Sequence, residues 1–195
     1  MDREASVSRK TRETEIQVEL RLDGAGEPQI STGVPFLDHL LESFARHGLF
    51  DLRIQAVGDL EVDQHHTLED VGITLGQAIR VAVGEAAGVA RFGSARIPMA
   101  DALVQVDLDL SSRPYLVYRV TLPRDWVGQF DAALVQDFLY ALCTHGGIDL
   151  HVELAYGQNV HHILEGIFKG LGRALDQATQ IDPRIRGPLS TKGSL

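Results

Sequence analysis

The stretch "FLDHLLESFARHGLFDLRI" (residues 36–54) returns in altered form as "LVQDFLYALCTHGGIDLHV" (residues 134–152). In both copies apolar residues recur at helical spacing up to a His-Gly pair, and an Asp-Leu pair then opens a segment of alternating polarity. Each copy therefore predicts a helix followed by a strand. The repetition indicates that the chain contains an internal duplication.

Segments on either side extend the duplication. "EIQVELRL" (15–22) matches "LVQVDLDL" (103–110), and both alternate with period two, as strands with one buried face do. The remaining expected elements are second strands at 28–32 and 115–122, helices at 35–48 and 131–144, third strands at 49–57 and 148–156, and last helices at 67–87 and 162–177. A polar stretch at 88–101 joins the halves. The sequence thus predicts an α+β fold made of a duplicated β-β-α-β-α unit, as two sheet-and-helix layers. The first half spans 1–92, the second half spans 93–180, and an irregular tail covers 181–195.

Composition sets limits on function. The chain has 195 residues, 44% of them apolar, which is enough to bury a sizeable core. Its net charge of −9 argues against non-specific nucleic-acid binding. No apolar run approaches membrane-spanning length, and the polar start is unlike a secretory signal. The lone Cys143 excludes a disulfide framework within the chain. We expect a cytoplasmic protein whose partners include neither nucleic acid nor membrane.

Two His-His-x-x-Glu motifs are the strongest chemical signal. "DQHHTLED" (63–70) and "NVHHILEG" (159–166) occupy the same place in the two halves. On a helix, positions i and i+4 share a face whereas i and i+1 diverge, so His65 and Glu69 can hold one metal while His66 points toward another. His161, His162 and Glu165 repeat the pattern. Imidazole and carboxylate ligands without thiolate suit Mn, Fe, Ni or Zn, and the two motifs predict a dinuclear site.

Simpler interpretations exist for these residues. A single His-His pair is more often a surface or capping feature, and duplication would also copy a purely structural motif. The repeat further aligns His39 with Asp137, both on the first helix of their half, and so suggests one more ligand for each ion. Asp137 taken alone would be read as a solvated helix position.

Several longer segments carry a family resemblance. They are "GVPFLDHLL" (33–41), "FARHGLFDL" (44–52), "DQHHTLEDVGITLGQA" (63–78), "RFGSARIPMADAL" (91–103), "LSSRPYLV" (110–117), "HHILEGIFKGLGRAL" (161–175) and "STKG" (190–193). Together they resemble the imidazoleglycerol-phosphate dehydratases of histidine biosynthesis, over nearly the whole chain. The resemblance implies a ribosomal protein S5 domain 2-like fold. It also implies a hydro-lyase that converts imidazole glycerol phosphate to imidazole acetol phosphate with two Mn²⁺ per active site.

The resemblance also implies how the ligands are shared. One ion would take His39, His66, His161 and Glu165, and the other would take His65, Glu69, His162 and the residue at 137. The family usually has His at that last position, so Asp137 is a departure that alters the charge of the site. Two cations that hold the substrate ring would lower its pKa and help it to push electrons toward the leaving hydroxyl.

Family matches name further residues for the substrate. Glu13 is expected to contact the substrate and to move protons outside the metal shell, although an isolated Glu is more often an exposed strand-edge charge. The remaining matches are expected to bind substrate, most of them through its phosphate: His47, Arg91, Arg113, Lys169, Ser190, Thr191 and Lys192. The resemblance implies a homo-oligomeric shell of about 24 subunits built from trimers, with active sites shared between neighbours.

Other functions remain open at this point. A dinuclear metallohydrolase acting on a phosphorylated small molecule would use the same ligands with an activated water. A metal-buffering protein would explain the histidines but not Arg91, Arg113, Lys169 and the "STK" segment (190–192). A metal-stapled structural protein is the third alternative. A dehydration assay with imidazole glycerol phosphate separates the first of these from the dehydratase.

Overall fold

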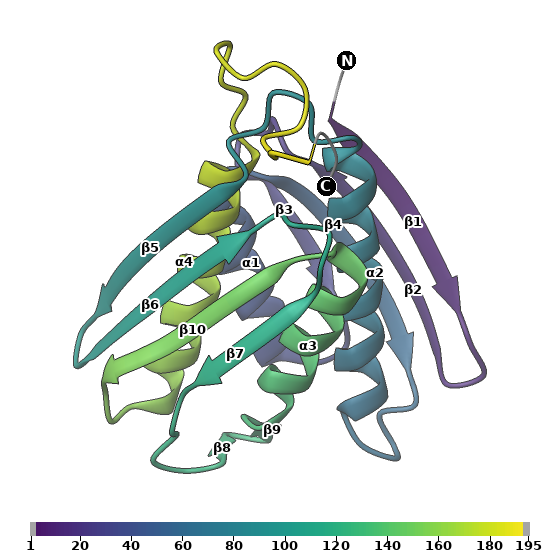
Figure 1. Cartoon of the computed structure of the whole chain (residues 1–195). Helices are drawn as coiled ribbons and strands as arrows, with labels where there is room; N and C mark the ends of the chain where they lie inside the picture. Colours follow the sequence, from purple (N-terminus) through teal and green to yellow (C-terminus); the bar gives the residue numbers. More distant parts are fainter. Residues whose placement is uncertain (1–2, 193–195) are drawn as a thin grey trace.

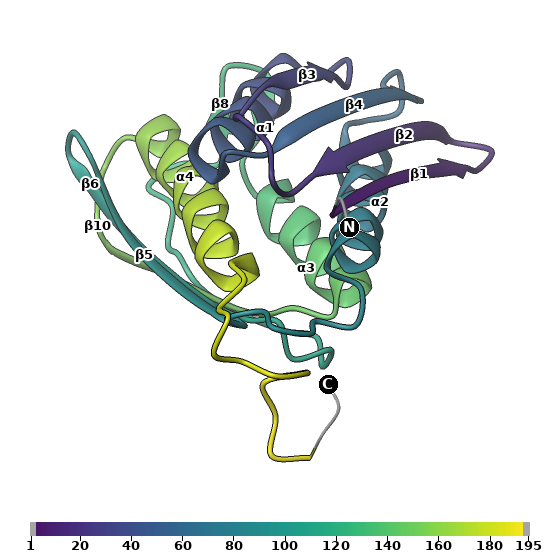
Figure 2. The same cartoon turned by 90° about the horizontal axis from the view of Figure 1, so that it is seen from above.

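The computed structural model describes residues 3–192 and consists of two four-stranded sheets with four helices between them (Figures 1 and 2). The first half contains β1 (Glu4–Lys10), β2 (Thr14–Arg21), β3 (Pro28–Ser31), α1 (Pro35–Gly48), β4 (Asp51–Gly58) and α2 (His65–Val83). The second half contains β5 (Phe92–Met99), β6 (Ala102–Asp109), β7 (Tyr115–Arg119), α3 (Leu134–Gly146), β10 (Asp149–Tyr156) and α4 (Val160–Thr179). A short hairpin of β8 (Trp126–Val127) and β9 (Phe130–Asp131) precedes α3.

The two sheets have the same topology. Their strand orders are β1-β2-β4-β3 and β5-β6-β10-β7, and corresponding neighbours pair in the same sense. β3 runs parallel to β4 and β7 runs parallel to β10, whereas the other neighbours are antiparallel. The predicted α+β fold with an internal duplication is therefore confirmed.

Each half begins with a strand that the sequence pattern did not predict. β1 and β5 are the edge strands of their sheets. β1 is mostly polar, and β5 contains Gly93 and Pro98 within the stretch expected to be a polar connection. An edge strand tolerates proline and polar residues because only one side is paired and its outer face meets solvent. The predicted β-β-α-β-α unit is thus preceded in each half by one further strand.

The last helices start earlier than expected, and this places both His-His motifs in a first turn. α2 begins at His65, where the Asp63 side chain accepts a hydrogen bond from the backbone N–H of His65 at 2.7 Å. α4 begins at Val160, and Asn159 caps it through the backbone N–H of His161 at 3.0 Å. α2 also ends at Val83, before the predicted residue 87, because Gly84 has a φ of 60°.

The helices of the two halves face each other in the centre of the molecule (Figure 2). α1 and α2 pack on the first sheet, α3 and α4 pack on the second, and the layers meet through the pairs α1–α4 and α2–α3. Phe44, Phe50, Phe138 and Phe168 are fully buried at this centre. The two predicted sheet-and-helix layers are present, joined helix to helix. In the part of the chain that the structure describes, no helix has the length and apolarity needed to cross a bilayer.

The chain after α4 returns to the connection between the halves. The backbone N–H of Ala90 donates to the carbonyl of Gln180 at 2.8 Å, and the N–H of Gly88 donates to the carbonyl of Gly187 at 3.0 Å. Figure 1 shows this tail beside the α2–β5 connection, at one end of the helices. Gly193, the last residue of the "STKG" motif, lies outside the described residues.

Candidate metal centre

Three predicted ligands converge where α1 meets α4. The Nε2 atoms of His39 and His161 lie 3.7 Å and 3.4 Å from Oε2 of Glu165. All three ligand atoms lie within 4.8 Å of one another. The α1–α4 contact thus brings together residues that are 126 positions apart in the chain (165 − 39).

The donor set of this triad fits a transition-metal ion. Ligand atoms bonded at about 2.1 Å to one ion lie about 3.0–3.5 Å apart at octahedral or tetrahedral angles. The separations within the triad are close to this range. Nε2 of His39 is buried and has no hydrogen-bond partner among residues 3–192, and a bound cation would supply one. Two imidazoles and one carboxylate suit Mn, Fe, Ni or Zn.

Lys169 and His47 lie near the same triad. The Lys169 ammonium donates to Oε1 of Glu165 at 2.8 Å. Burial alone would raise the pKa of Glu165, but the hydrogen bond and charge of Lys169 outweigh it and lower that pKa, with smaller contributions from the two histidines. Burial, followed by the charges of Lys169 and Arg173, lowers the pKa of His47. Glu165 is therefore ionised and His47 neutral at neutral pH.

A second group of predicted ligands lies at the α2–α3 contact. Nδ1 of His65 is 3.7 Å from Oδ2 of Asp137, and both side chains are about half exposed. Glu69 lies one turn after His65 on α2 and is exposed. The structure thus places a histidine and a carboxylate side by side where the repeat alignment suggested them.

His66 points away from His65 and toward the β1–β2 turn. Nδ1 of His66 is 3.0 Å from Oδ2 of Asp59, and its Nε2 is 3.9 Å from Oε2 of Glu13. The turn that carries Glu13 is fixed by Thr11, whose Oγ1 accepts from the backbone N–H of Glu13 at 3.1 Å. Glu13, the predicted proton carrier, therefore lies beside a predicted metal ligand.

His162 makes an analogous contact in the second half. Its Nδ1 is 2.6 Å from Oδ1 of Asp101. That hydrogen bond, together with those from the backbone N–H groups of Gln158 and Asn159, lowers the pKa of the Asp101 carboxyl well below its usual value. Asp101 is thus an ionised acceptor held at the start of α4.

A cationic pocket of about 660 Å³ lies at the tail. It is lined by Arg91, Arg113, Arg184, Ile185, Arg186, Pro188, Leu189, Ser190, Thr191 and Lys192. Arg91 is paired with Asp109 at 2.7 Å and donates to the carbonyl of Leu189 at 2.7 Å. Five of the predicted substrate-binding residues therefore share one pocket with an anion-binding composition.

This pocket and the metal ligands are at opposite ends of α4. His161 stands in the first turn, and the tail leaves the helix after Thr179. At 1.5 Å per residue the separation along the helix is about 27 Å. The structure therefore divides the predicted site residues of one chain into a metal-ligand end, which includes Lys169 and His47, and a cationic tail end.

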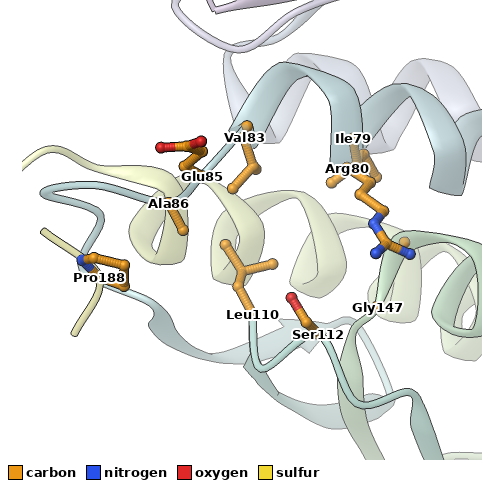
Figure 3. Close-up of a pocket in the computed structure, with 11 residues that line it drawn as sticks. Ile79, Arg80, Val83, Glu85, Ala86, Leu110, Ser112, Gly147 and Pro188 are labelled. Carbon is orange, nitrogen blue, oxygen red and sulfur yellow. The ribbon is translucent and has the colours of Figure 1, made fainter. Parts of the chain in front are cut away.

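A separate pocket contains none of the predicted site residues. It has a volume of about 400 Å³ and lies between the C-terminal end of α2, the loop at Leu110–Ser112 and Pro188 (Figure 3). Arg80 and Glu85 are its charged side chains. Its position at the far end of α2 from His65 separates it from the metal ligands.

Four residues at these sites were not predicted from the sequence: Asp59, Asp101, Arg184 and Arg186. Asp59 has no acidic equivalent, since it aligns with the segment 155–157 at the repeat offsets, whereas Asp101 in the β5–β6 turn aligns with Glu13 at the offset of 88. For the two arginines the sequence did contain a signal, because "DPRIRG" (182–187) is a basic segment close to the "STKG" motif.

Comparison with known proteins identifies a family over most of the chain. Residues 32–175 match the family model described as imidazoleglycerol-phosphate dehydratase. The enzyme of that name from Geobacter metallireducens is 53% identical over 195 residues, which is the full length of both chains. The one from Geobacillus kaustophilus is 54% identical, also over the full length of both.

Two solved structures of the same family are also similar to this chain. Imidazoleglycerol-phosphate dehydratase from Staphylococcus aureus superposes with a TM-score of 0.82 at 34% identity, covering 91% of this chain and 100% of the other. A complex of IGPD from Pyrococcus furiosus gives a TM-score of 0.84 at 41% identity, covering 96% and 99%. On the strength of the family model and the full-length relatives, the chain belongs to the imidazoleglycerol-phosphate dehydratase family.

Proposed function

We propose that this chain dehydrates imidazole glycerol phosphate to imidazole acetol phosphate, a step of histidine biosynthesis, with two Mn²⁺ in each active site. The activity follows from family membership over the full length of the relatives. The observation that carries the metal assignment is the convergence of His39, His161 and Glu165, with an unsatisfied Nε2 on His39. Dehydration accounts for the metal ligands and the cationic pocket together, whereas a metal-buffering or purely structural protein would need only the ligands.

The ligands fall into two sets of four. One ion would be held by His39, His66, His161 and Glu165, and the other by His65, Glu69, Asp137 and His162. Three members of the first set and two of the second already lie together within one chain. Bound at these positions, the cations would polarise the substrate and stabilise negative charge on its ring.

Glu13 is the residue we assign to proton transfer. Loss of water removes a hydroxyl from one carbon and a proton from its neighbour, and the resulting enol becomes the ketone by a second proton transfer. The Glu13 carboxylate stands 3.9 Å from His66, is half exposed, and lies on a turn fixed by Thr11. It can therefore exchange protons with a substrate bound next to His66.

The tail pocket would bind the phosphate. Arg113, Arg186 and Lys192 have no carboxylate partner within the described residues, so their charges are available to a phosphate dianion. Imidazole and phosphate in the substrate are joined by only three carbons, which cannot span the length of α4. We therefore propose that one chain's tail pocket completes a neighbour's metal site in a homo-oligomer, for which a shell of about 24 subunits built from trimers is our model. The buried free thiol of Cys143 fits a cytoplasmic location.

The test is removal and restoration of metal. The protein is stripped with a chelator, and conversion of imidazole glycerol phosphate is followed before and after Mn²⁺ is added. We expect activity to disappear and to return at two Mn²⁺ per chain. A Glu165→Gln variant, treated identically, should show little recovery, because it loses the charge at the centre of the triad. Metal-independent turnover would contradict the assignment.

A further inference from the structure

We propose that Asp59 and Asp101 are positioning residues that fix the tautomers of His66 and His162, so that Nε2 of each ring is the nitrogen that binds metal. The inference rests on the dinuclear centre proposed above and adds to it two residues outside both ligand sets. These two histidines are the predicted ligands that point away from the groups formed within the chain.

The Asp101 carboxylate contacts three groups at the start of α4. Oδ2 accepts from the backbone N–H groups of Gln158 and Asn159 at 2.8 Å and 2.9 Å. Oδ1 faces Nδ1 of His162 at 2.6 Å. One side chain from the β5–β6 turn thus fixes both the entry into α4 and the orientation of the imidazole ring.

Asp59, which follows β4, makes the corresponding contact with Nδ1 of His66. Both of its carboxylate oxygens face Nδ1 of His66, at 3.0 Å and 3.2 Å. Its backbone N–H donates to the carbonyl of Glu13 at 3.1 Å, which ties this aspartate to the turn that carries the proposed proton carrier. Asp59 therefore links the ring of His66 to the position of Glu13.

The chemistry of the contact fixes the tautomer. An ionised carboxylate only accepts hydrogen bonds, so the facing Nδ1 must carry the proton. A neutral imidazole has one N–H, and Nε2 is then left with a lone pair. Carboxylates that accept from the non-ligating nitrogen commonly orient histidine ligands and raise their basicity.

The origin of the two aspartates argues against an accidental by-product of duplication. Asp59 follows β4 in the first half, whereas Asp101 lies between β5 and β6 in the second. Glu13, the equivalent of Asp101 at the offset of 88, lies beside Nε2 of His66 at 3.9 Å, whereas the contact to Nδ1 of His66 comes from Asp59, which has no acidic equivalent. A requirement on the histidines themselves explains this convergence.

The structure predicts that, at position 101, the conservative Asn variant lowers Mn²⁺ affinity more than the Ala variant does. In Asp101→Asn the two backbone donors will claim the amide oxygen, which turns the NH₂ group toward His162. Nδ1 of His162 must then accept a hydrogen bond, and Nε2, the proposed metal-binding nitrogen, must carry the proton. Asp101→Ala removes the contact, so that residue 101 no longer favours either tautomer of His162. We expect Asn to weaken one of the two Mn²⁺ ions by about 10- to 100-fold, and Ala to weaken it less.

The experiment measures Mn²⁺ stoichiometry and affinity for the full chain and its variants, with thermal unfolding recorded for each. Asp51→Asn is the matched control, because Asp51 likewise accepts two backbone N–H groups, at 2.8 Å and 3.2 Å, but contacts no histidine. A merely structural role of Asp101 predicts that Ala is worse than Asn in both metal affinity and stability. We expect the opposite order for metal affinity.

A variant that lacks the His162 ring tests whether Asp101 acts through that ring. In a His162→Ala protein, Asp101→Asn should have no further effect on Mn²⁺ affinity, since the residue acts through that ring. At position 59 the test variant is Asp59→Ala, because within residues 3–192 only His66 donates to this carboxylate and an amide oxygen could replace it. Asp59→Ala should weaken the ion that Asp101→Asn spares.

The outcomes separate the two proposals. If the unaltered chain binds fewer than two Mn²⁺, the dinuclear centre is wrong and this inference falls with it. If it binds two, and Asp101→Asn binds both as tightly or still acts in the His162→Ala background, only the tautomer assignment is overturned.

Discussion

Among single side chains, Asp137 is the position where the predicted ligands of the two halves differ in residue type. Its repeat equivalent is His39, and it faces Nδ1 of His65 at 3.7 Å. A carboxylate is a competent ligand for Mn²⁺ and adds a negative charge that a histidine would not. Asp137→Ala should therefore weaken one of two bound ions by at least about tenfold, and Asp137→His should recover most of that affinity. Gln136→Ala, at the exposed neighbouring position, is the control. Two ions bound with unchanged affinity in Asp137→Ala would remove Asp137 from the ligand set.

Cys143 gives a prediction about pH. Burial, with a contribution from the charge of Asp149, raises the pKa of this thiol to about 12, whereas an unfolded thiol has a pKa of about 8.5. Between these values the unfolded chain releases a proton that the folded chain keeps. The free energy of unfolding should therefore fall as pH rises above about 9, by up to about 1.4 kcal/mol per pH unit from this group. The fall ends near the folded pKa.

Urea unfolding at several alkaline pH values checks this. Cys143→Ala should lose the part of the pH dependence that belongs to the thiol, so that its curve converges on that of the unaltered chain as pH rises. The native thiol should also react with iodoacetamide far more slowly than the thiol of the unfolded chain at pH about 9. Parallel stability curves would show that Cys143 does not contribute.

Among the helices, the α1–α4 contact depends on a close backbone approach at Gly172. A Cβ at this position would lie 2.3 Å from the carbonyl oxygen of Phe44 and 3.0 Å from the backbone nitrogen of Gly48. Gly172→Ala should destabilise by about 1–3 kcal/mol from overpacking, which exceeds the gain of about 1 kcal/mol in helix propensity. Because His39 and Glu165 face each other across the same contact, metal affinity should fall too.

Gly166→Ala is the matched control on the same helix. Its Cβ would meet a side-chain methyl of Val104 at 3.3 Å, which can shift more easily than backbone. Urea unfolding should therefore show a much smaller loss for Gly166→Ala than for Gly172→Ala. Equal losses would mean that glycine at position 172 is not needed for the helix contact.

The order of most elements could be predicted from the sequence, and the exceptions have a common cause. The helices and the half-buried strands β2 and β6 show clear periodicity, because one face is buried. β1 and β5 are edge strands with mixed or polar faces, so their pairing depends on a neighbouring strand and leaves a weak pattern of its own. The helices start earlier than predicted because Asn159 caps α4, and the Asp63 side chain accepts a hydrogen bond from the first backbone N–H of α2.

For the site, the duplicated motif named residues that the fold brings together at two helix contacts. The triad of His39, His161 and Glu165 could be anticipated, because ligand type and helical spacing are both visible in the sequence. The contacts of Asp59 and Asp101 could not, because they arise from loops that only tertiary structure brings to the histidines. The separation of about 27 Å between the metal ligands and the tail pocket likewise follows only from the structure, which puts them at opposite ends of α4.

The proposed homo-oligomer can be tested directly for active sites that are shared between chains. We propose that a site takes its α4 ligands, such as Glu165, from one chain and its α2 ligands, such as His66, from a neighbour. Glu165→Gln and His66→Ala should then each be inactive alone. When the two variants are unfolded together and co-assembled in equal amounts, roughly one quarter of the sites should pair an intact α4 end with an intact α2 end. Turnover with Mn²⁺ should recover to about that fraction. A mixture of Glu165→Gln with His161→Ala is the control and should stay inactive, since both changes damage the same end. If both ends of a site came from one chain, co-assembly of Glu165→Gln with His66→Ala would restore nothing.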